Sequence, residues 1–458
     1  MSILAAVSVP HPPLILPQIG KGEEQKIKNT IKAYKKAMKF LAAYKPETVV
    51  IISPHSVMYR DYFHVSPHSS AEGSMARFGA PEITIHSDYD KEFVSCLEQI
   101  CRRFDFPCGT SGEQDASLDH GTFIPLHFFD EAYSKYQVVR IGLSDLSLLH
   151  HYELGRLIAL TADKLNRRTV IIASGDLSHK LSANGPYGFV KEGPIYDQKI
   201  TSVLQNADFM TMLNMSPQLC EAASECGHRS FVIMAGALDG KKVKAKLLSY
   251  EGPFGVGYGV AQFAVGSEDK TRHFGTQYLA ELEKMRQKED AYVQLARQTV
   301  ETYVTSKKMP LNTSLPTEML FARAGAFVSI KKRGILRGCI GTINAAQNCL
   351  AAEIMQNAVA ACSRDPRFEP VRAYELSELV YSVDILMPAE PVSSIAELNA
   401  KKYGVIVENG NRRGLLLPDI EGVDTPQQQI VIAKQKAGIA ESEDIKLSRF
   451  EVVRHKVD

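Results

Sequence analysis

Residues 3–11 read ILAAVSVPH, a short apolar run that ends at a histidine preceded by a proline. The same arrangement returns as TVVIISPH at residues 48–55, and a longer form, TVIIASGDLSH, stands at residues 169–179. A fourth run, YQVVRIGLS at residues 136–144, is similarly apolar. Runs of this length, rich in valine and isoleucine, are typical of strands that are covered on both faces. The sequence therefore predicts a buried sheet with histidines beside several strand ends.

The stretch between the first two runs has a helical pattern over residues 23–44. Its apolar residues recur at steps of three and four, which indicates one buried stripe of a helix. The stripe consists of Ile27, Ile31, Tyr34, Met38 and Leu41. Strand, helix and strand in this order favour a βαβ unit. We therefore predict an α/β fold for the N-terminal part, with a largely parallel sheet flanked by helices.

The length of the chain, 458 residues, exceeds the roughly 250–300 residues over which a single core keeps growing. Apolar periodicity stops near GSEDKTRHFGTQ, so we expect an N-terminal domain over residues 1–266 and a linker or connecting helix over residues 267–289. A smaller α+β domain is expected over residues 290–458. Its predicted strands include a pair in AGAFVSIKKRGILRGCIGTI and a hairpin that turns near Asn409 and Gly410.

Charge and composition exclude several classes of partner. Lys and Arg number 53 and Asp and Glu 52, so a formal net charge of +1 gives no electrostatic footprint for nucleic acid or an anionic membrane. The apolar run Ile3 to Val9 is too short for a signal sequence or a membrane span. Eight cysteines without a CxxC pair are typical of free thiols in a reducing compartment. We expect a cytoplasmic protein that binds neither nucleic acid nor membrane.

Three histidines follow the predicted strands: His11, His55 and His179. The carboxyl ends of parallel strands meet at one crevice, where ligands bind in open α/β sheets. These side chains, distant in sequence, are therefore expected to be neighbours in space. A fourth candidate, His120, stands at the predicted start of a helix. The alternative for each histidine is an ordinary hydrogen-bonded loop residue.

Two neutral imidazoles and one carboxylate form the ligand set of many non-haem iron sites. The favoured carboxylate is Glu225, in ASECGHRSFVIMAGAL just before a predicted apolar helix. Asp176 and Asp119 are less favoured alternatives. Glu225 is equally consistent with a negative charge that stabilises the N-terminus of that helix.

Four motifs in this order resemble a known family: VPHPP, IISPHS, LDHGTFIPL and SGDLSH. They are similar to the B-subunit-like (LigB) superfamily of class III extradiol ring-cleaving dioxygenases, over about Ile3 to Val265. The resemblance implies Fe(II) held by His11, His55 and Glu225. It also implies His179 as acid and base, and His120 as a residue that holds substrate or O2. The implied substrate is a small catechol-like or aminophenol-like aromatic compound.

A second resemblance leaves the third ligand open. Memo-like proteins share this fold but carry a cysteine where the carboxylate is expected, and here Cys226 adjoins Glu225. A thiolate ligand would favour copper or zinc. The alternative function is then a metal-binding accessory protein of a modification pathway, handling copper or iron. A third functional hypothesis is a metal-dependent hydrolase that activates water.

The C-terminal part resembles the AMMECR family over roughly Ala291 to Arg454, through the stretch LRGCIG at residues 336–341 and through SRDPRF. This resemblance implies no biochemical role, but the fused arrangement implies a radical-SAM partner protein, and the superfamily tends to form homo-oligomers. Cys339 could be a reactive thiol whose pKa Arg337 lowers. Its alternative is a strand cysteine among glycines.

Overall fold

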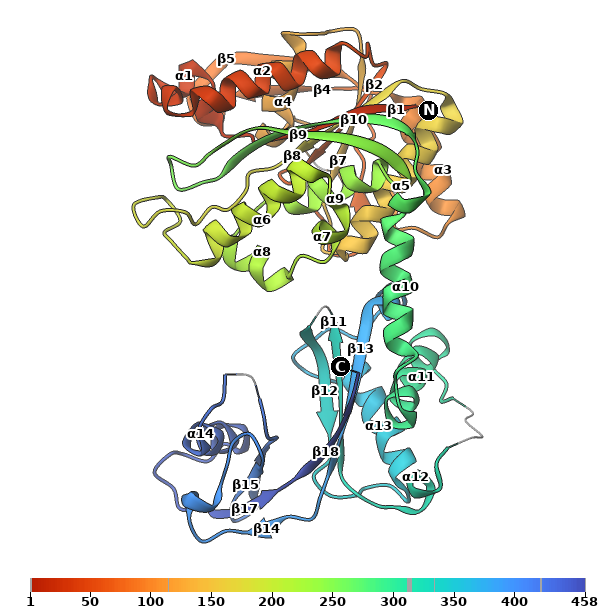
Figure 1. Ribbon diagram of the computed structural model, residues 1–458, viewed down its shortest axis with the longest axis vertical. Coiled ribbons are helices and arrows are strands. Elements are labelled where there is room, and N and C mark those ends of the chain that lie inside the picture. Colours follow the sequence, from red (N-terminus) through yellow and green to blue (C-terminus); the bar gives the residue numbers. More distant parts are fainter. Residues whose placement is uncertain (1, 114, 311–314, 333, 421, 458) are drawn as a thin grey trace. The chain divides into compact units, whose positions relative to one another are not determined.

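The computed structural model describes residues 2–113, 115–310, 315–332, 334–420 and 422–457 (Figure 1). The chain divides into two compact units, Met1–Tyr278 and Leu279–Asp458. Helix α10 (Phe274–Arg286) occupies much of the stretch where a connecting helix was expected. Within the described ranges, every helix is too short or too polar to cross a bilayer.

A six-stranded sheet forms the centre of the first unit. Its strands in spatial order are β7 (Gln137–Gly142), β2 (Thr48–Ser53), β8 (Thr169–Ser174), β1 (Ile3–Val9), β10 (Tyr258–Glu268) and β9 (Lys241–Glu251). The first four run parallel, and β10 and β9 add two antiparallel strands beside β1. The four parallel strands therefore direct their carboxyl ends to the same edge.

The parallel strands are buried because helices cover both faces of the sheet. All six residues of β2 and all six of β8 are buried, and Val50 pairs with Ile171 at the centre of the sheet. Each buried valine or isoleucine side chain stabilises the fold by about 1.5–3 kcal/mol relative to an exposed one. The α/β fold with a largely parallel sheet, predicted from these apolar runs, is confirmed.

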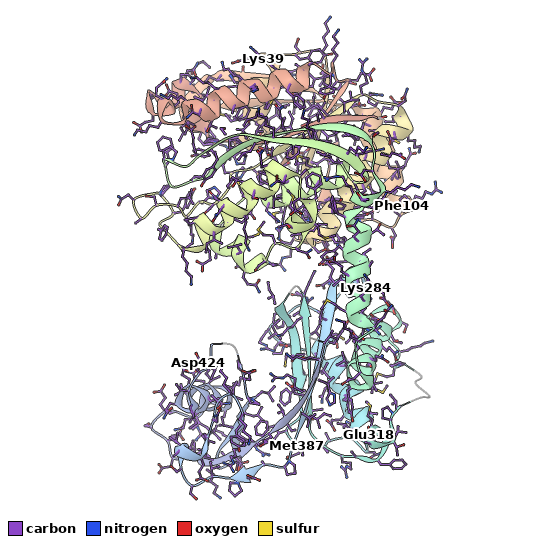
Figure 2. All side chains as sticks on the ribbon, in the orientation of Figure 1. Lys39, Phe104, Lys284, Glu318, Met387 and Asp424 are labelled. Atoms are coloured by element: carbon purple, nitrogen blue, oxygen red, sulfur yellow. The ribbon has the colours of Figure 1, made fainter. Side chains whose placement is uncertain are left out.

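Helices α2 (Lys28–Ala42) and α4 (His120–Asp130) cover one face of the sheet, and α5 (Leu148–Leu165) and α9 (His228–Ala237) cover the other (Figure 1). Helix α2 buries Tyr34, Met38 and Leu41 of the predicted stripe, and it exposes lysines such as Lys39 on its outer side (Figure 2). The remaining elements of this unit are α1 (Pro17–Gly20), β3 (Phe63–His64), β4 (Ser70–Met75), β5 (Ala80–Asp88), α3 (Lys91–Arg103), β6 (Cys108–Gly109), α6 (Glu192–Asn206), α7 (Phe209–Leu213) and α8 (Pro217–Ala223).

Strand β9 forms one edge of the sheet and carries a row of exposed lysines, Lys242, Lys244 and Lys246. One backbone donor of this strand already has a partner in α6: the N–H of Leu247 donates a hydrogen bond to the Gln205 side chain at 2.7 Å. Charged side chains on an edge strand oppose pairing with another strand.

The second unit is built on antiparallel sheets. One sheet has the order β12 (Ile335–Gly341), β11 (Ala326–Lys332), β13 (Leu379–Leu386) and β18 (Val452–Lys456). The other has the order β14 (Glu390–Pro391), β17 (Lys446–Phe450), β15 (Gly404–Asn409) and β16 (Arg412–Leu416). The helices are α11 (Ala291–Ser306), α12 (Thr317–Phe321), α13 (Leu350–Ser363) and α14 (Pro426–Ala437). The predicted C-terminal α+β organisation is confirmed, although residue 333 of the predicted β11–β12 turn lies outside the described residues.

Candidate metal centre

The loops after three parallel strands carry the predicted histidines to one edge of the sheet. His11 follows β1, His55 follows β2 and His179 follows β8. His120 is the first residue of α4, whose N-cap, Asp119, accepts a hydrogen bond from Thr122 N at 3.0 Å. All four imidazoles border the same cleft.

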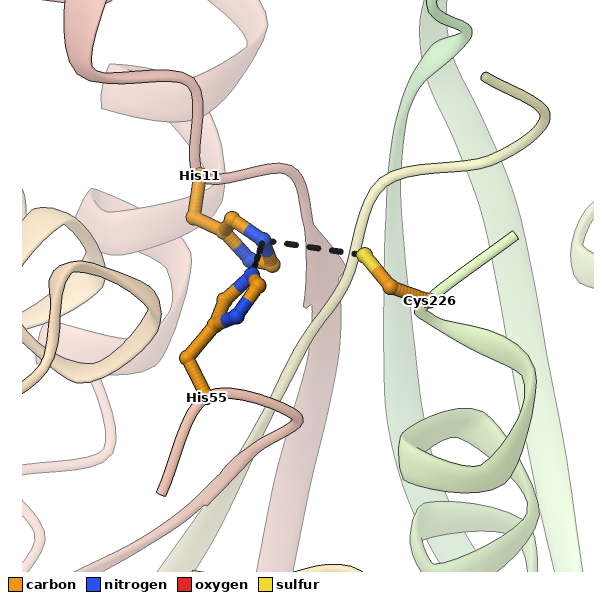
Figure 3. A group of neighbouring side chains, drawn as sticks. All are labelled: His11, His55 and Cys226. Carbon is orange, nitrogen blue, oxygen red and sulfur yellow. Dashed lines mark hydrogen bonds between the residues drawn. The ribbon is translucent and has the colours of Figure 1, made fainter. Parts of the chain in front are cut away.

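His11, His55 and Cys226 form the centre of this cluster (Figure 3). The Nε2 atoms of His11 and His55 are 3.0 Å apart, and Cys226 Sγ is 3.7 Å from His11 Nε2. Their candidate ligand atoms all lie within 4.8 Å of one another. Two imidazole nitrogens and a sulfur facing one another at this spacing form a donor set suited to a transition metal ion.

Hydrogen bonds behind the cluster orient the His11 ring. Ser174 Oγ lies 2.9 Å from His11 Nδ1, and the backbone N–H of His11 donates to Asp176 Oδ1 at 2.8 Å. With the proton on Nδ1, the lone pair of Nε2 faces His55 and Cys226. Outer partners of this kind fix the tautomer and direction of a metal-binding histidine.

Cys226 reaches the histidines because two backbone segments approach closely. A Cβ added at Gly175 would lie 2.0 Å from the Cα of Gly227, so neither position has room for a side chain. This contact brings the loop after β8 against the loop before α9. Across it, the backbone N–H of Asp176 donates to Cys226 Sγ at 3.2 Å. Burial raises the pKa of the Cys226 thiol well above its usual value.

Glu225, the carboxylate expected as third ligand, lies outside the cluster. Its Oε2 atom accepts a hydrogen bond from the backbone N–H of His228 at 2.5 Å, at the start of α9. Burial raises the pKa of Glu225 to about 7. The Glu225 carboxylate is therefore engaged at the start of α9, and among the described residues it is Cys226, not Glu225, whose side chain joins His11 and His55 in the cluster.

The imidazoles of the cluster are neutral near pH 7. Burial, reinforced by the neighbouring histidines, holds the pKa of His11 well below its usual value. Burial also lowers the pKa of His55 and His179, and it lowers that of His120 to about 4. Neutral imidazole is the form that binds metal or accepts a proton.

His179 and His120 stand beside the three candidate ligands. The Nδ1 atom of His179 contacts the carbonyl oxygen of Ser224, which only accepts, so Nδ1 carries the proton and Nε2 is left as a base. The ring of His120 stacks on that of His55 with centroids 4.1 Å apart. Both side chains are thus held by neighbours in fixed positions.

The cleft that these residues border has a volume of ≈ 760 Å³. Much of its remaining lining is aromatic and proline-rich, with Phe78, Tyr187, Phe254 and Tyr258 among the lining residues. A second cavity of ≈ 650 Å³ shares His55, Phe78 and His120 with the first. The volume and apolar lining suit a small organic ligand.

The other candidate residues have structural surroundings of their own. Asp119 accepts a hydrogen bond from Ser53 Oγ at 2.5 Å and caps α4, whereas Asp176 lines the cleft. In the second unit Arg337 donates to both carboxylate oxygens of Glu375 at 2.9 Å. Burial raises the pKa of Cys339, so the lowering expected from Arg337 is wrong.

Sequence reasoning missed the residues that support and surround the cluster. Ser174 stands at the end of an apolar run, and its role depends on a ring that arrives from β1. The aromatic walls come from loops, and hydrophobic periodicity does not predict that these loops lie beside the histidines. The only available signals were the Gly175–Asp176 pair after the strand and the Cys226–Gly227 pair before the helix.

Comparisons with known proteins agree with this architecture. The family of the catalytic LigB subunit of aromatic ring-opening dioxygenases matches residues 5–261, and the AMMECR1 family matches residues 293–455. The chain belongs to the LigB family and carries an AMMECR1 domain after it.

Relatives extend along the whole chain. A protein of Clostridium acetobutylicum is 38% identical over 474 residues and covers 100% of both chains. A Thermotoga maritima protein is 53% identical over 171 residues, which is 37% of this chain and 98% of its own. Among solved structures, an uncharacterized protein from Pyrococcus horikoshii shares 29% identity over 36% of this chain and 88% of its own, with a TM-score of 0.33. Another from Escherichia coli shares 15% identity over 57% of this chain and 99% of its own, with a TM-score of 0.40.

Proposed function

We propose that the N-terminal domain is a metal-dependent oxidoreductase of the extradiol type, which opens the ring of a small catechol-like or aminophenol-like compound. Two observations carry this proposal: His11, His55 and Cys226 bring their candidate ligand atoms together, and His11, His55 and His179 line one cleft with aromatic side chains. Membership of the LigB family supports the same class of chemistry.

His11, His55 and Cys226 would hold the metal. A thiolate carries one negative charge, as a carboxylate does, so a divalent ion bound by these three residues keeps a single net positive charge. Bound Fe(II) would supply the Lewis acidity and the redox chemistry that a reaction between a diol and O2 requires. The protein then contributes the orientation of both reactants and the transfer of protons.

His179 is the proposed proton-transfer residue. Its Nδ1 atom is held by the Ser224 carbonyl, and its Nε2 atom makes no hydrogen bond to the part of the chain that the structure describes. Burial lowers the pKa of the ring, so the side chain is a neutral base near pH 7. It would accept the proton of a substrate hydroxyl and return one later. His120, stacked on His55, would contact the substrate or O2 as a neutral imidazole.

A second candidate function is favoured by Cys226 itself. A sulfur ligand selects softer metal ions, and two imidazoles with a thiolate also suit copper. The domain would then be a Memo-like metal-binding protein that serves another enzyme, with no ring-cleaving activity of its own.

The test loads purified protein with Fe(II) without oxygen and then adds O2 with a panel of catechols and aminophenols. Formation of an absorbing ring-fission product supports the oxidoreductase, and we expect His179→Phe to retain iron but to lose turnover. His11→Ala and His55→Ala should lose iron, whereas the exposed histidine variant His86→Ala should retain it. Tight Cu(I) binding without turnover of any compound would instead support the accessory protein.

A further inference from the structure

The cleft beside the candidate metal centre has no positively charged side chain among the described residues that line it. From this property we propose that the substrate is an uncharged aromatic diol and that carboxylated catechols are rejected. The inference rests on the proposed function and specifies the substrate class of the same site.

Outside the histidines and Asp176, the described lining of the cleft suits an uncharged ligand. Aromatic rings and prolines form much of the surface, through Phe78, Tyr187, Phe254 and Tyr258 and through Pro12, Pro13, Pro186 and Pro253. Polar side chains at the rim are neutral, namely Ser182 and Asn184. Such walls accept the faces and edges of an aromatic ring but give no ionic partner to a carboxylate.

Three cations stand beside residues of the cleft or line the second cavity, but none of them lines the cleft itself. Lys26 lies 5.7 Å from the centroid of the Phe254 ring but pairs with Glu23 at 2.6 Å and does not line the cleft. Arg77 and Arg140 line the second cavity, which shares Phe78 with the cleft and also contains Asp115 and Asp119, and Arg140 pairs with Glu113. A carboxylate in the cleft would therefore meet none of these cations among the described residues that line it.

Asp176 adds an acidic group to the lining of the cleft. It is buried, and its Oδ1 atom accepts the backbone N–H of His11 at 2.8 Å. Whether ionised or protonated, this side chain offers no positive charge. A substrate carboxylate would thus face aromatic rings and a further acid, without a cationic side chain among the described lining residues.

Charge at the metal leads to the same expectation. A divalent ion held by one thiolate and two neutral imidazoles keeps one positive charge, which a singly deprotonated diol neutralises. A second negative charge on the ligand would remain uncompensated in a partly buried site, and uncompensated buried charges are strongly unfavourable. The cleft should therefore discriminate by charge between ligands of equal size.

The first test uses protocatechuate and its carboxamide, two diols that differ in charge but hardly in size. Binding to the full chain, loaded with Fe(II) without oxygen, is measured by calorimetry, so that no turnover is needed. We expect the carboxamide to bind at least about tenfold more tightly than the carboxylate. Equal or tighter binding of protocatechuate would overturn the charge rule alone. Failure of both ligands and of catechol itself to bind would overturn the proposed function.

The second test places a cation at the rim of the cleft. Asn184→Lys should strengthen protocatechuate binding by at least about tenfold while changing carboxamide binding by less than about threefold. Asn184→Gln, which is long but neutral, should change neither affinity by more than about threefold. An equal gain for both ligands with lysine, or a gain with glutamine, would contradict the charge rule.

Discussion

At the scale of single residues, Glu225 and Cys226 are chain neighbours that contact different parts of the protein. The Glu225 carboxylate accepts the N–H of His228, while Cys226 Sγ lies 3.7 Å from His11 Nε2. A difference of one position thus exchanges a hard oxygen for a soft sulfur beside the two imidazoles. The identity of the preferred metal depends on which of the two is the ligand.

We expect Cys226→Ser to weaken metal binding by at least about tenfold, because a hydroxyl is a poor replacement for a thiolate ligand. Glu225→Gln should leave the affinity within about threefold, since an amide oxygen can still accept the hydrogen bond at the start of α9. Competition titration with a chromophoric chelator measures both variants. A loss of metal in Glu225→Gln with retention in Cys226→Ser would restore the carboxylate as ligand.

Metal affinity should rise with pH. The pKa of His11 and His55 is lowered, so these ligands already lack a proton near neutrality, but the pKa of Cys226 is raised and its thiol must release one to bind metal. One released proton raises the apparent affinity about tenfold per pH unit between roughly pH 6 and pH 8. Ionisation of Asp176, whose pKa is raised to about 7, acts in the same direction.

This dependence is measured by repeating the chelator titration across the pH range. Cys226→Ser is the matched comparison, and it should show a clearly shallower slope. A wild-type affinity independent of pH would mean that Cys226 is not a ligand.

At the scale of elements, the contact between the loop after β8 and the loop before α9 positions the sulfur. We expect Gly175→Ala to destabilise the fold by about 1–3 kcal/mol, because its methyl group would meet the Gly227 backbone rather than a movable side chain. It should also weaken metal binding, since it separates Cys226 from the histidines.

The control is Gly266→Ala in β10, where the nearest atom, at 3.3 Å, belongs to the Lys242 side chain. Urea unfolding measures the free-energy difference, and chelator titration measures the metal. Gly175→Ala with wild-type stability and affinity would contradict the role assigned to the glycine contact.

The strands of the parallel sheet could be predicted from the sequence, whereas the loops that complete the site could not. Periodicity predicted the parallel strands, and strand polarity then placed His11, His55 and His179 at one edge, because parallel strands end on the same side. Periodicity contains no signal for a contact between glycines 52 positions apart, so Cys226 could be named only as the alternative to Glu225. The cleft walls were unpredictable for the same reason, since irregular loops supply Tyr187 and Phe254.

At the scale of the whole molecule, the two units have separate apolar cores. One core lies around the six-stranded sheet, and another is formed by α11, α13 and the β11 sheet. We expect calorimetry to resolve two unfolding transitions, of which added metal raises only one. At a hundredfold excess over Kd, binding adds about 2.7 kcal/mol to the unit that holds the metal, which corresponds to a shift on the order of 5 °C.

Cys226→Ser should reduce this shift by about half or more, because a tenfold weaker affinity leaves about 1.4 kcal/mol at the same metal concentration, and it should not move the other transition. A single transition that metal raises as a whole would show that the two units unfold together, contrary to this expectation.

The lysine row on β9 has a consequence for how copies of the protein behave when crowded. Lys242, Lys244 and Lys246 would meet their counterparts if two such edges aligned, so like charges keep the strand from templating fibrils. Acetylating these amines would remove the repulsion and leave an edge in which only some backbone donors, such as that of Leu247, are already occupied. Acetylation of these lysines would then leave the metal centre unchanged but make the β9 edge prone to aggregation.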